Sequence, residues 1–386
     1  MKLLYLTHRC PYPPNKGERI RCFNVLKHLA QCHDLTLAYP IFSAEEATYT
    51  QTLRQYAQLV LTVPIRPLLA QSKCLFGLCS RRPLTLSYFY SSKLQHIIQN
   101  RAFDLVLADC SSMAQYVIGS KKPKIVDFVD IDSDKWQAYA RDAKPPKSFI
   151  YNMEYRRLSL FEDRVTQTFD YCLVVSEEEK KLLKYEKNVV VMPNGIDCQF
   201  FTPRAEQNPN VLIFTGAMDY FPNIDGVSYF HREIWPLVKA QQPDVRFVVA
   251  GMQPHARIKA LASDEVLITG YVPDIRDSLV QATVCVVPLR IAKGIQNKVL
   301  EAMAMGIPVV ATRAANTGIH AQDGQQILLA DSPQEFARAI MLLLHDVQLR
   351  RTIAANARQF VQDHFSWEKH LGTLDTLIER LTHKHP

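Results

Sequence analysis

A lysine and a glutamate three residues apart are the side chains whose types and spacing best suit chemistry in this chain. Lys298 and Glu301 fall in the run Gly-Ile-Gln-Asn-Lys-Val-Leu-Glu, for which the pattern predicts a loop and then a helix over residues 297–305. Residues three apart share one helix face. A lysine at a helix N-terminus suits phosphate, and a carboxylate can accept hydrogen bonds from two ribose hydroxyls. The pair therefore predicts a nucleoside diphosphate site, and the alternative is an ordinary surface ion pair.

A second candidate anion site lies between the first predicted strand and the first predicted helix. The loop Pro-Pro-Asn-Lys-Gly-Glu-Arg-Ile-Arg contains Lys16, Gly17, Glu18 and Arg21. A glycine lets backbone N–H groups approach an anion, and the basic side chains add positive charge. Because this position borders the ligand crevice of a doubly wound sheet, we expect a loop that binds an anion such as phosphate; the alternative is a simple connector.

Further candidate contacts follow predicted strands in the second half of the chain. Gly216 directly follows a strand signal, where open α/β sheets place their ligands, and Asn223 lies shortly after it. Tyr271 and Val272 follow another strand signal. A nucleotide base needs a flat apolar wall with one or two polar groups, which this loop offers, although Tyr271 could equally pack in the core.

An acidic segment, Asp-Phe-Val-Asp-Ile-Asp-Ser-Asp-Lys-Trp, follows a strand signal in the first half. Asp130 and Asp132 form an Asp-x-Asp pair of the kind that can hold a divalent cation with a diphosphate. The two predicted parallel sheets favour another role for this segment, and we expect Asp132 or Ser133 as a helix N-cap. The twelve histidines show no metal-ligand spacing, so we predict neither a metal nor a cofactor, and His8 receives no role.

The elements that must position these residues alternate along the chain. Strand signals occur at 2–7, 35–38, 59–63, 105–108, 125–128, 172–175 and 188–192, then at 211–215, 245–250, 266–269, 284–287, 309–311 and 327–329. Helical patterns separate them, the first over 18–31 and the last over 333–344, 347–364 and 367–383. Short apolar strands separated by helices predict an α/β protein with two doubly wound parallel sheets. The turn residues at 193–197 and a polar linker over 202–209 divide them.

Composition agrees with a globular two-domain protein. A chain of 386 residues is too long for one core, and no apolar run reaches the ~18–20 residues of a transmembrane helix. Nine cysteines without a Cys-x-x-Cys pair indicate reduced thiols and a cytoplasmic location.

The net positive charge of the chain lies entirely in its first half. Residues 1–200 hold 27 Lys and Arg against 20 Asp and Glu, whereas residues 201–386 hold 18 of each. Basic and aromatic residues also interleave from Ile65 to Tyr90. This pattern predicts weak contact with the inner face of the cytoplasmic membrane; the alternative is a solvated helical segment. Without a recognised binding motif, the modest charge excludes nucleic acid as a partner.

Together the motifs resemble glycosyltransferase family 4, and within it the sugar transferases associated with exopolysaccharide and exosortase (PEP-CTERM) systems. The resemblance rests on the loop at 13–21, the acidic segment at 127–136, Thr-Gly-Ala-Met-Asp-Tyr at 215–220 and the run containing Lys298 and Glu301. It implies the GT-B fold, in which two Rossmann-like domains face each other across a cleft and a C-terminal helix crosses back. The implied acceptor domain is 1–200 with helix 366–386, and the implied nucleotide-sugar domain is 201–365.

The resemblance also implies residue roles on the donor side. Glu301 matches the second of two family glutamates, which binds the donor ribose, and Lys293 replaces the first, near the donor sugar. Gly294 and Ile295 belong to the same donor loop.

The family's two pyrophosphate cations are absent from their usual positions. Ala217 and Asp225 stand in their places, so Lys298, with Lys293, is the expected substitute. The loop at 13–21 resembles the family's first loop, which faces the donor phosphates and the acceptor. Gly17 and Asp130 match positions near the reacting centre, so the resemblance implies that Asp130 lies in the catalytic cleft.

The implied activity is metal-independent transfer of a hexosyl unit, with retention, from a nucleoside-diphosphate sugar to a saccharide or lipid-linked acceptor in cell-surface glycan synthesis. No carboxylate pair is placed for double displacement, so we expect front-side departure of a phosphate stabilised by Lys298. The alternatives are a sugar-nucleotide 2-epimerase of the same fold and a degenerate scaffold that only binds nucleotide sugar.

Overall fold

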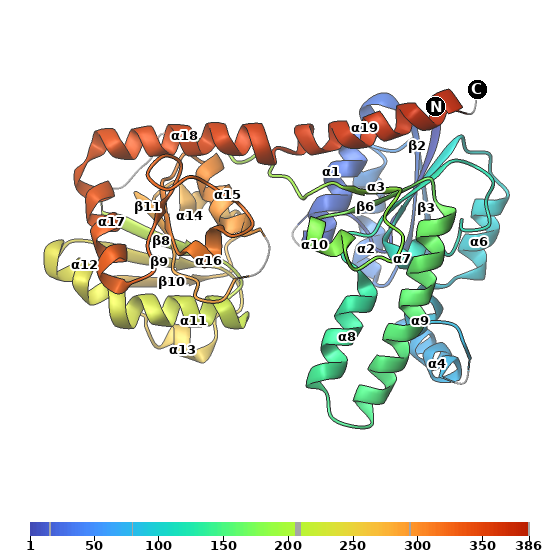
Figure 1. The fold of residues 1–386 in the computed structure, drawn as a ribbon, viewed down its shortest axis with the longest axis horizontal. Coiled ribbons are helices and arrows are strands. Elements are labelled where there is room, and N and C mark those ends of the chain that lie inside the picture. The colour runs from blue at the N-terminus through green and yellow to red at the C-terminus, as the bar shows by residue number, and fades with distance from the viewer. Residues whose placement is uncertain (15–16, 79, 205–209, 293–294, 385–386) are drawn as a thin grey trace. The chain divides into compact units, whose positions relative to one another are not determined.

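Two compact units make up the chain (Figure 1). The computed structural model describes residues 1–14, 17–78, 80–204, 210–292 and 295–384. Unit 1 consists of Met1–Asn194 and His370–Pro386, and unit 2 of Gly195–Lys369. The division falls inside the Pro-Asn-Gly-Ile-Asp turn, six residues before the boundary expected from the sequence. Three predicted site residues, Lys16, Lys293 and Gly294, lie outside the described residues.

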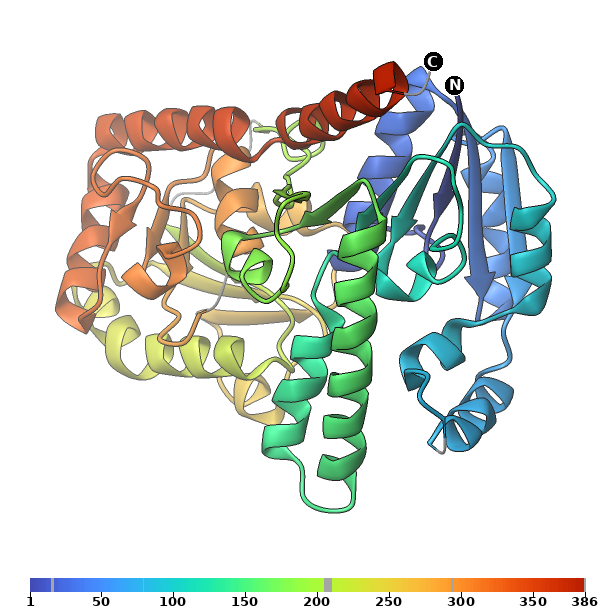
Figure 2. The same cartoon turned by 45° about the vertical axis from the view of Figure 1, so that its right-hand side comes forward.

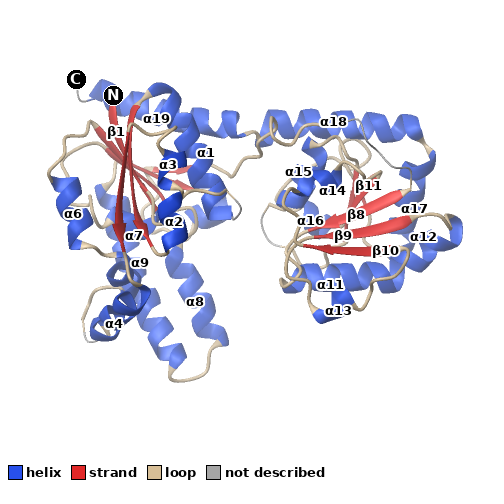
Figure 3. Ribbon diagram, turned by 180° about the vertical axis from the view of Figure 1, so that it is seen from behind, coloured by secondary structure: helices blue, strands red, loops and turns tan. Residues whose placement is uncertain are grey.

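Unit 1 is built on a seven-stranded parallel sheet with the order β3-β2-β1-β4-β5-β6-β7. Its strands are β1 Lys2–Leu6, β2 Asp34–Ile41, β3 Leu59–Pro64, β4 Leu105–Asp109, β5 Lys124–Asp127, β6 Tyr171–Val174 and β7 Val189–Val191. All five residues of β4 are buried. Helices on both faces explain this burial, which is why the central strands are continuously apolar in sequence (Figure 3).

The helices of unit 1 include a long antiparallel pair, α8 and α9, that extends beyond the sheet (Figure 2). The helices are α1 Gly17–Cys32, α2 Ala44–Thr48, α3 Thr50–Leu53, α4 Pro67–Gly77, α5 Leu84–Phe89, α6 Ser92–Gln99, α7 Cys110–Ala114, α8 Asp132–Asp142, α9 Lys147–Thr168 and α10 Glu177–Lys180. The last helix of the chain, α19 (Trp367–Lys384), returns to this unit. There His28 Nε2 of α1 lies 2.9 Å from Asp375 Oδ1 of α19, which confirms the predicted crossing helix.

Unit 2 contains a six-stranded parallel sheet with the order β10-β9-β8-β11-β12-β13. Its strands are β8 Val211–Thr215, β9 Arg246–Ala250, β10 Val266–Gly270, β11 Val284–Val287, β12 Val309–Ala311 and β13 Leu328–Leu329. Its helices are α11 Phe221–Tyr229, the π-helical turn η1 Phe230–Ile234, α12 Trp235–Gln241, α13 Ala256–Lys259, α14 Ile275–Leu279, α15 Asn297–Ala304, α16 Arg313–Asn316, α17 Pro333–His345 and α18 Val347–Phe365. The predicted α/β fold of two parallel-sheet domains is thus confirmed. Among the described residues, no helix combines the length and apolar character that a membrane crossing requires.

Every predicted strand forms, and β2 departs most from its predicted bounds. Its predicted end was Ala38, but it continues to Ile41 and pairs with β3. Pro40 lies in this extension. Because β1 pairs with β2 only as far as Ala38, Pro40 needs to donate no hydrogen bond on that side, so the proline does not end the strand.

In each sheet the next strands in sequence are added first on one side of the first strand and then on its other side. In unit 1 β1 lies between β2 and β4, and in unit 2 β8 lies between β9 and β11. At such a switch point the connecting segments leave two neighbouring strands toward opposite faces, so a crevice opens at the strands' carboxyl ends. The carboxyl ends of β1 and β4, and of β8 and β11, are therefore the places where each unit can hold a ligand.

A buried ion pair joins α1 to the central sheet of unit 1. Arg21 is 1% exposed and donates to Asp127 through Nε at 2.7 Å and Nη2 at 3.0 Å. Its Nη1 donates to the carbonyl of Met192 at 2.9 Å and to Asn194 Oδ1 at 3.0 Å. The sequence suggested that Arg21 would present its charge to phosphate. That expectation is wrong, because the guanidinium is already bound within the fold.

We predict that Arg21→Met lowers the opening free energy of α1 and β5 by about 3–5 kcal/mol, because it leaves the buried Asp127 carboxylate without its cation. Hydrogen exchange resolved by mass spectrometry measures this locally. Adding Asp127→Asn should restore part of the loss, and Arg101→Met, at an exposed position, should change little. Equal protection in Arg21→Met and Arg101→Met would contradict the prediction.

Candidate functional site

The predicted lysine lies at the switch point of unit 2. Lys298, in the first turn of α15, donates from Nζ to Asn223 Oδ1 at 2.6 Å, and its Nζ lies 4.9 Å from the centre of the Phe214 ring. Asn223 in turn donates from Nδ2 to the carbonyl of Ala217 at 2.8 Å. The Asn223 side chain therefore links the loop after β8 to the cation of α15, although Asn223 and Lys298 are 75 residues apart in sequence.

Two glycines allow the backbone to approach closely at this point. A Cβ atom on Gly216 would lie 2.8 Å from Asn223 Nδ2 and 3.3 Å from Lys298 Cε. A Cβ atom on Gly251, at the end of β9, would lie 1.7 Å from the carbonyl oxygen of Gly216. No larger residue fits at either position without moving the backbone or the lysine. The structure thus brings Gly216, Asn223 and Lys298 together, as the sequence suggested.

Burial shifts the pKa of both charged residues of α15 toward neutrality. It lowers the pKa of Lys298 to about 8, and the opposing effect of Glu301 is smaller. It raises the pKa of Glu301 to about 7, against the opposing effect of Lys298. Near pH 7–8 the cation and the carboxylate coexist, although each is held at a cost in solvation. Such pairs are typical of sites that meet a charged ligand.

Exposed apolar side chains also follow several strands at the carboxyl edge of this sheet. Tyr271, after β10, is 69% exposed, so the alternative that it packs in the core is wrong. Tyr220 and Phe221 after β8 and Ile291 after β11 are also at least half exposed. Sequence reasoning missed these three, although each stands shortly after a predicted strand. Val272 and Ile295 are partly buried.

An arginine that the sequence analysis did not consider occupies the same edge. Arg290 follows β11 and pairs with Asp225, with Nε 3.0 Å from Oδ2. Its guanidinium also lies 4.9 Å from the centre of the Tyr229 ring. A carboxylate at position 225, where a cation was expected by resemblance, is thus matched by a cation from the neighbouring loop. The position after a predicted strand was the signal available in the sequence.

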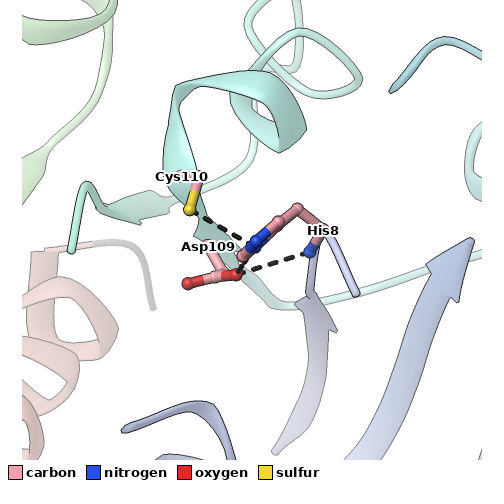
Figure 4. Close-up of side chains that lie close together, drawn as sticks. All are labelled: His8, Asp109 and Cys110. Atoms are coloured by element: carbon pink, nitrogen blue, oxygen red, sulfur yellow. Dashed lines mark hydrogen bonds and ion pairs between the residues drawn. The ribbon is translucent and has the colours of Figure 1, made fainter. Parts of the chain in front are cut away.

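In unit 1, three side chains meet at the switch point between β1 and β4 (Figure 4). His8 Nδ1 lies 2.6 Å from Asp109 Oδ2 and 3.3 Å from Cys110 Sγ. The backbone N–H of His8 also donates to Asp109 Oδ2, at 3.4 Å. His8 is 8% exposed and Asp109 is 1% exposed. The sequence gave His8 no role because its partners lie about a hundred residues away.

A pocket of about 400 Å³ opens beside this cluster. Asp130, which was predicted to face a catalytic cleft, is exposed and lines the pocket together with Lys135. The remaining lining includes the aromatic residues Tyr88, Phe89, Phe128, Trp136 and Tyr139. The pocket therefore has an apolar aromatic wall with a few charged groups, as small-molecule sites do.

The predicted N-cap of α8 is wrong. The helix begins at Asp132 with Ile131 as its N-cap, and Asp132 instead accepts a hydrogen bond from Ser111 Oγ at 2.9 Å. Its side chain therefore links α8 to α7 beside the pocket. Gly17 and Glu18 open α1, which begins one residue before its predicted start at Glu18.

Among the described residues, one group presents donor atoms close enough to hold a metal ion, namely His8, Asp109 and Cys110, with ligand atoms within 4.8 Å of one another. Burial, with the carboxylates of Asp109 and Asp132 nearby, raises the pKa of the Cys110 thiol well above its usual value. A neutral thiol is a weak ligand, and His8 Nδ1 already bonds to Asp109. The arrangement fits a hydrogen-bonded histidine–aspartate pair better than a metal centre.

Comparisons with known proteins match part of unit 2 to a family model and most of the chain to one relative. Residues 209–346 match a family model described as "Glycosyl transferases group 1". An uncharacterized 44.6 kDa protein in the cps region of Klebsiella pneumoniae is 22% identical over 95% of this chain and 97% of its own length. An uncharacterized glycosyltransferase of Methanocaldococcus jannaschii is 33% identical over 90 residues, which is 23% of each chain.

Solved structures match the fold over its whole length. Anabaena HepE in complex with UDP has a TM-score of 0.66 at 16% identity and covers 98% of this chain and 100% of its own. Sucrose-phosphate synthase from Thermosynechococcus elongatus has a TM-score of 0.66 at 17% identity and covers all of both chains. These structural neighbours have the GT-B glycosyltransferase fold.

The pKa of Glu301 gives a test of whether this carboxylate is held for ligand binding. The pKa of Glu301 in the folded state, about 7, exceeds its usual value of 4.5. Ionisation of Glu301 therefore lowers the stability of the folded state as the pH rises from 4.5 to 7. We predict that Glu301→Gln stabilises unit 2 at pH 8 and raises its unfolding temperature by roughly 2–8 °C. This range corresponds to a gain of about 1–2 kcal/mol, because about 1 kcal/mol shifts the unfolding temperature of a domain of this size by 2–4 °C.

The gain should shrink toward pH 5, where Glu301 is itself protonated. Calorimetry at both pH values measures the difference, with Asp264→Asn, at an exposed position of the same unit, as the control. A destabilisation by Glu301→Gln at pH 8 would show that the carboxylate stabilises the fold.

Proposed function

We propose that this chain is a retaining glycosyltransferase that moves a hexosyl unit from a nucleoside-diphosphate sugar to a saccharide or lipid-linked acceptor. One observation carries the proposal. At the switch point of unit 2, Lys298 is held by Asn223 against Gly216, with Glu301 one turn further along the same helix. The family match over residues 209–346 includes all four residues.

The donor nucleotide follows from the chemistry of these groups. The half-buried cation and the N-terminus of α15 suit the diphosphate, and Glu301 can accept from the two ribose hydroxyls. Tyr271, exposed at the same edge, offers a flat wall for the base. The complex of HepE with UDP supports this assignment, because that protein shares the fold. Val272, Ile295, Gly294 and Lys293 complete the proposed donor loop.

Catalysis requires that charge on the departing diphosphate be stabilised as it develops. Lys298 is suited to this, because a cation in a partly dehydrated site acts more strongly than one in water. A lysine in this role replaces the divalent cation that other transferases use, so we propose that the reaction needs no metal or other cofactor. Front-side departure, with the acceptor attacking on the face that the diphosphate leaves, gives retention.

The acceptor belongs to unit 1 in this proposal. The pocket beside Asp130 has aromatic walls on which a sugar ring can stack, and Lys135 adds a cation for a phosphate-bearing lipid acceptor. Gly17, at the start of α1, would border the reacting centre, with Lys16 and Glu18 beside it. The cps-region relative supports a role in cell-surface or exopolysaccharide synthesis.

The two α15 residues should fail in different ways when each is replaced by alanine. Lys298→Ala should lower turnover more than nucleoside affinity, because charge on the leaving group grows in the transition state. Glu301→Ala should weaken both nucleoside and nucleoside diphosphate by roughly 1.5–3 kcal/mol, the value of a hydrogen bond to a charged group. Calorimetric titration and single-turnover assays with a panel of nucleotide sugars measure these effects.

Lys259→Ala, on the exposed side of α13, is the matched control and should change neither quantity. Equal loss of nucleoside affinity in Lys298→Ala and Glu301→Ala would contradict the assignment. The same panel tests the alternatives: epimerised or hydrolysed donor without transfer would indicate a 2-epimerase, and binding without turnover would indicate a scaffold. Activity that is lost in EDTA and restored by a divalent cation would overturn the metal-independent mechanism.

Unit 1 should also attach weakly to anionic membranes through α4. Leu68 is 80% exposed and Leu69 is 57% exposed, and Arg66 and Lys73 on either side are exposed as well. Each basic residue near an anionic surface contributes about 1 kcal/mol, and salt screens this attraction. This location, on the cytoplasmic face of the membrane, would bring the chain to lipid-linked acceptors.

We predict cosedimentation with anionic vesicles at low salt that fades at 1 M salt and is weakened severalfold by Arg66→Gln with Lys73→Gln. Neutral vesicles are the control for the lipid, and Arg101→Gln is the control for charge elsewhere on unit 1. Equal sedimentation with both vesicle types, or none at low salt, would show that the basic excess serves another purpose.

A further inference from the structure

A hollow of about 290 Å³ on unit 2 is lined by arginines. One side of it is a face of α18, which packs beside α15 (Figure 1). The rest of the lining consists of Gly306 and Pro308, shortly before β12, and Pro203 of the linker. Because the strands of this sheet are parallel, the amino end of β12 lies at the edge opposite to the one where Gly216 follows β8. The hollow is therefore separate from the proposed donor residues.

The sequence of α18 explains how the hollow and its charge arise together. Arg350, Arg351 and Arg358 line the hollow, with Ala354 and Ala355 between them in sequence. Residues four apart share one face of a helix, so positions 350, 354 and 358 form one row and positions 351 and 355 the next. The alanine side chains end at Cβ and leave space, which the arginines bound at either end of about two helical turns.

Every charged side chain in this lining is positive. None of the three arginines forms an ion pair with a carboxylate of the part of the chain that the structure describes. Another exposed arginine of the same unit, Arg313, does have such a partner, with Nη1 3.5 Å from Asp331 Oδ2. Residues 201–386 hold equal numbers of basic and acidic side chains, so an excess of positive charge in this half of the chain does not explain the cluster.

Two of the arginines have structural contacts that must be separated from ligand binding. Arg350 Nη1 donates to the carbonyls of Leu343 and Leu344, at 3.0 and 3.2 Å, in the last turn of α17. Arg358 Nη1 donates to the carbonyl of Ala304, the last residue of α15. Cations near helix C-termini stabilise the helices, so these bonds account for the positions of both side chains.

The same bonds leave donors for an anion. In both Arg350 and Arg358 they use only Nη1, and Nε and Nη2 have no hydrogen-bond partner among the described residues. A guanidinium that is already held on one side loses less freedom when it binds a ligand. Arg351 is exposed and forms neither a hydrogen bond nor an ion pair within the described ranges. The structural contacts therefore explain two of the three charges, and the charge of Arg351 calls for another partner.

We propose that this hollow binds a phosphoryl group, carried by a soluble small molecule or by a lipid headgroup. A guanidinium presents a planar pair of N–H donors that matches two oxygens of a phosphate, and several such groups around one hollow can neutralise a dianion. The volume is close to the lower end of small-molecule sites, about 300 Å³. The proposal does not depend on the proposed function, because it uses none of the donor or acceptor residues.

Inorganic pyrophosphate is the probe for a soluble ligand. Every protein in the comparison carries Lys298→Ala, which removes the other cation proposed to meet a diphosphate, and this variant is the parent. We expect calorimetric titration to show that the parent binds pyrophosphate at one site and that Arg351→Gln binds it at least about tenfold more weakly, because a charge-assisted hydrogen bond is lost. The affinity of the parent should fall as salt is added.

A second variant, Ala355→Leu, tests the hollow and leaves its charge unchanged. Leucine is nearly as good a helix former as alanine and position 355 is exposed, so α18 should fold while the larger side chain fills the space. We expect this variant to bind pyrophosphate severalfold more weakly than the parent. Arg338→Gln, at an exposed position of α17, is the matched control for charge and should bind like the parent.

Vesicles that contain phosphatidic acid test the lipid source. Vesicle binding that requires Arg351, without pyrophosphate binding that requires it, would support the phosphoryl site and assign the group to a lipid headgroup. Equal affinity of the parent and Arg351→Gln for both probes, or no binding of either at millimolar concentration, would overturn the proposal.

Two further outcomes would also count against a phosphoryl site. Loss of pyrophosphate binding in Arg351→Gln with full binding in Ala355→Leu would show that the anion meets surface charge outside the hollow. Self-association of the parent that Arg351→Gln abolishes, with neither probe bound, would show that the arginines meet an acidic surface of a second copy. Neither result would affect the proposed function, which is tested with Lys298 intact.

Discussion

Reversal of strand order beside β1 and β8 is the constraint on which the rest of this structure depends. A parallel sheet needs a crossover after each strand, and these crossovers cover both of its faces. Only where neighbouring crossovers leave toward opposite faces does the carboxyl edge stay open. Each unit has one such point, and the side chains best suited to chemistry gather there: Lys298 with Asn223 in one unit, and His8 with Asp109 in the other.

Charged groups that the fold withdraws from water differ in how completely other parts of the chain pair with them. Arg21 shows the structural form, in which four hydrogen bonds satisfy the guanidinium and leave it no freedom to meet a ligand. Lys298 and Glu301 show a different form. Their pKa values move toward neutrality, to about 8 and about 7, because burial is only partly offset by their mutual attraction. If the proposed donor binds here, its diphosphate and ribose would add partners for this pair, so ligand binding would also offset the cost of desolvation.

Local patterns in the sequence predicted most of the fold. Strands such as β8 and β11 are short apolar runs bounded by glycine or proline, and helix α17 begins at Ser332 with a capping box. The predictions that failed depend on contacts between distant segments. The sequence alone predicts Arg21 as a phosphate-binding cation, but Asp127 at the end of β5 binds it. It likewise predicts Asp132 as an N-cap, but the side chain of Asp132 accepts a hydrogen bond from Ser111 of α7.

The residues of the candidate sites likewise fall into those that local sequence patterns indicate and those that only the fold brings together. Lys298 and Glu301 are visible in sequence because three-residue spacing on a helix is a local signal. His8 and Asp109 are 101 residues apart, and no spacing rule joins them. Only the strand order, in which β4 lies beside β1 although two strands intervene in sequence, makes them neighbours. Given that order, a polar residue at or shortly after the carboxyl end of each of the two switch-point strands becomes the signal to look for. Applied to unit 2, this rule finds Arg290 after β11, which the sequence analysis missed.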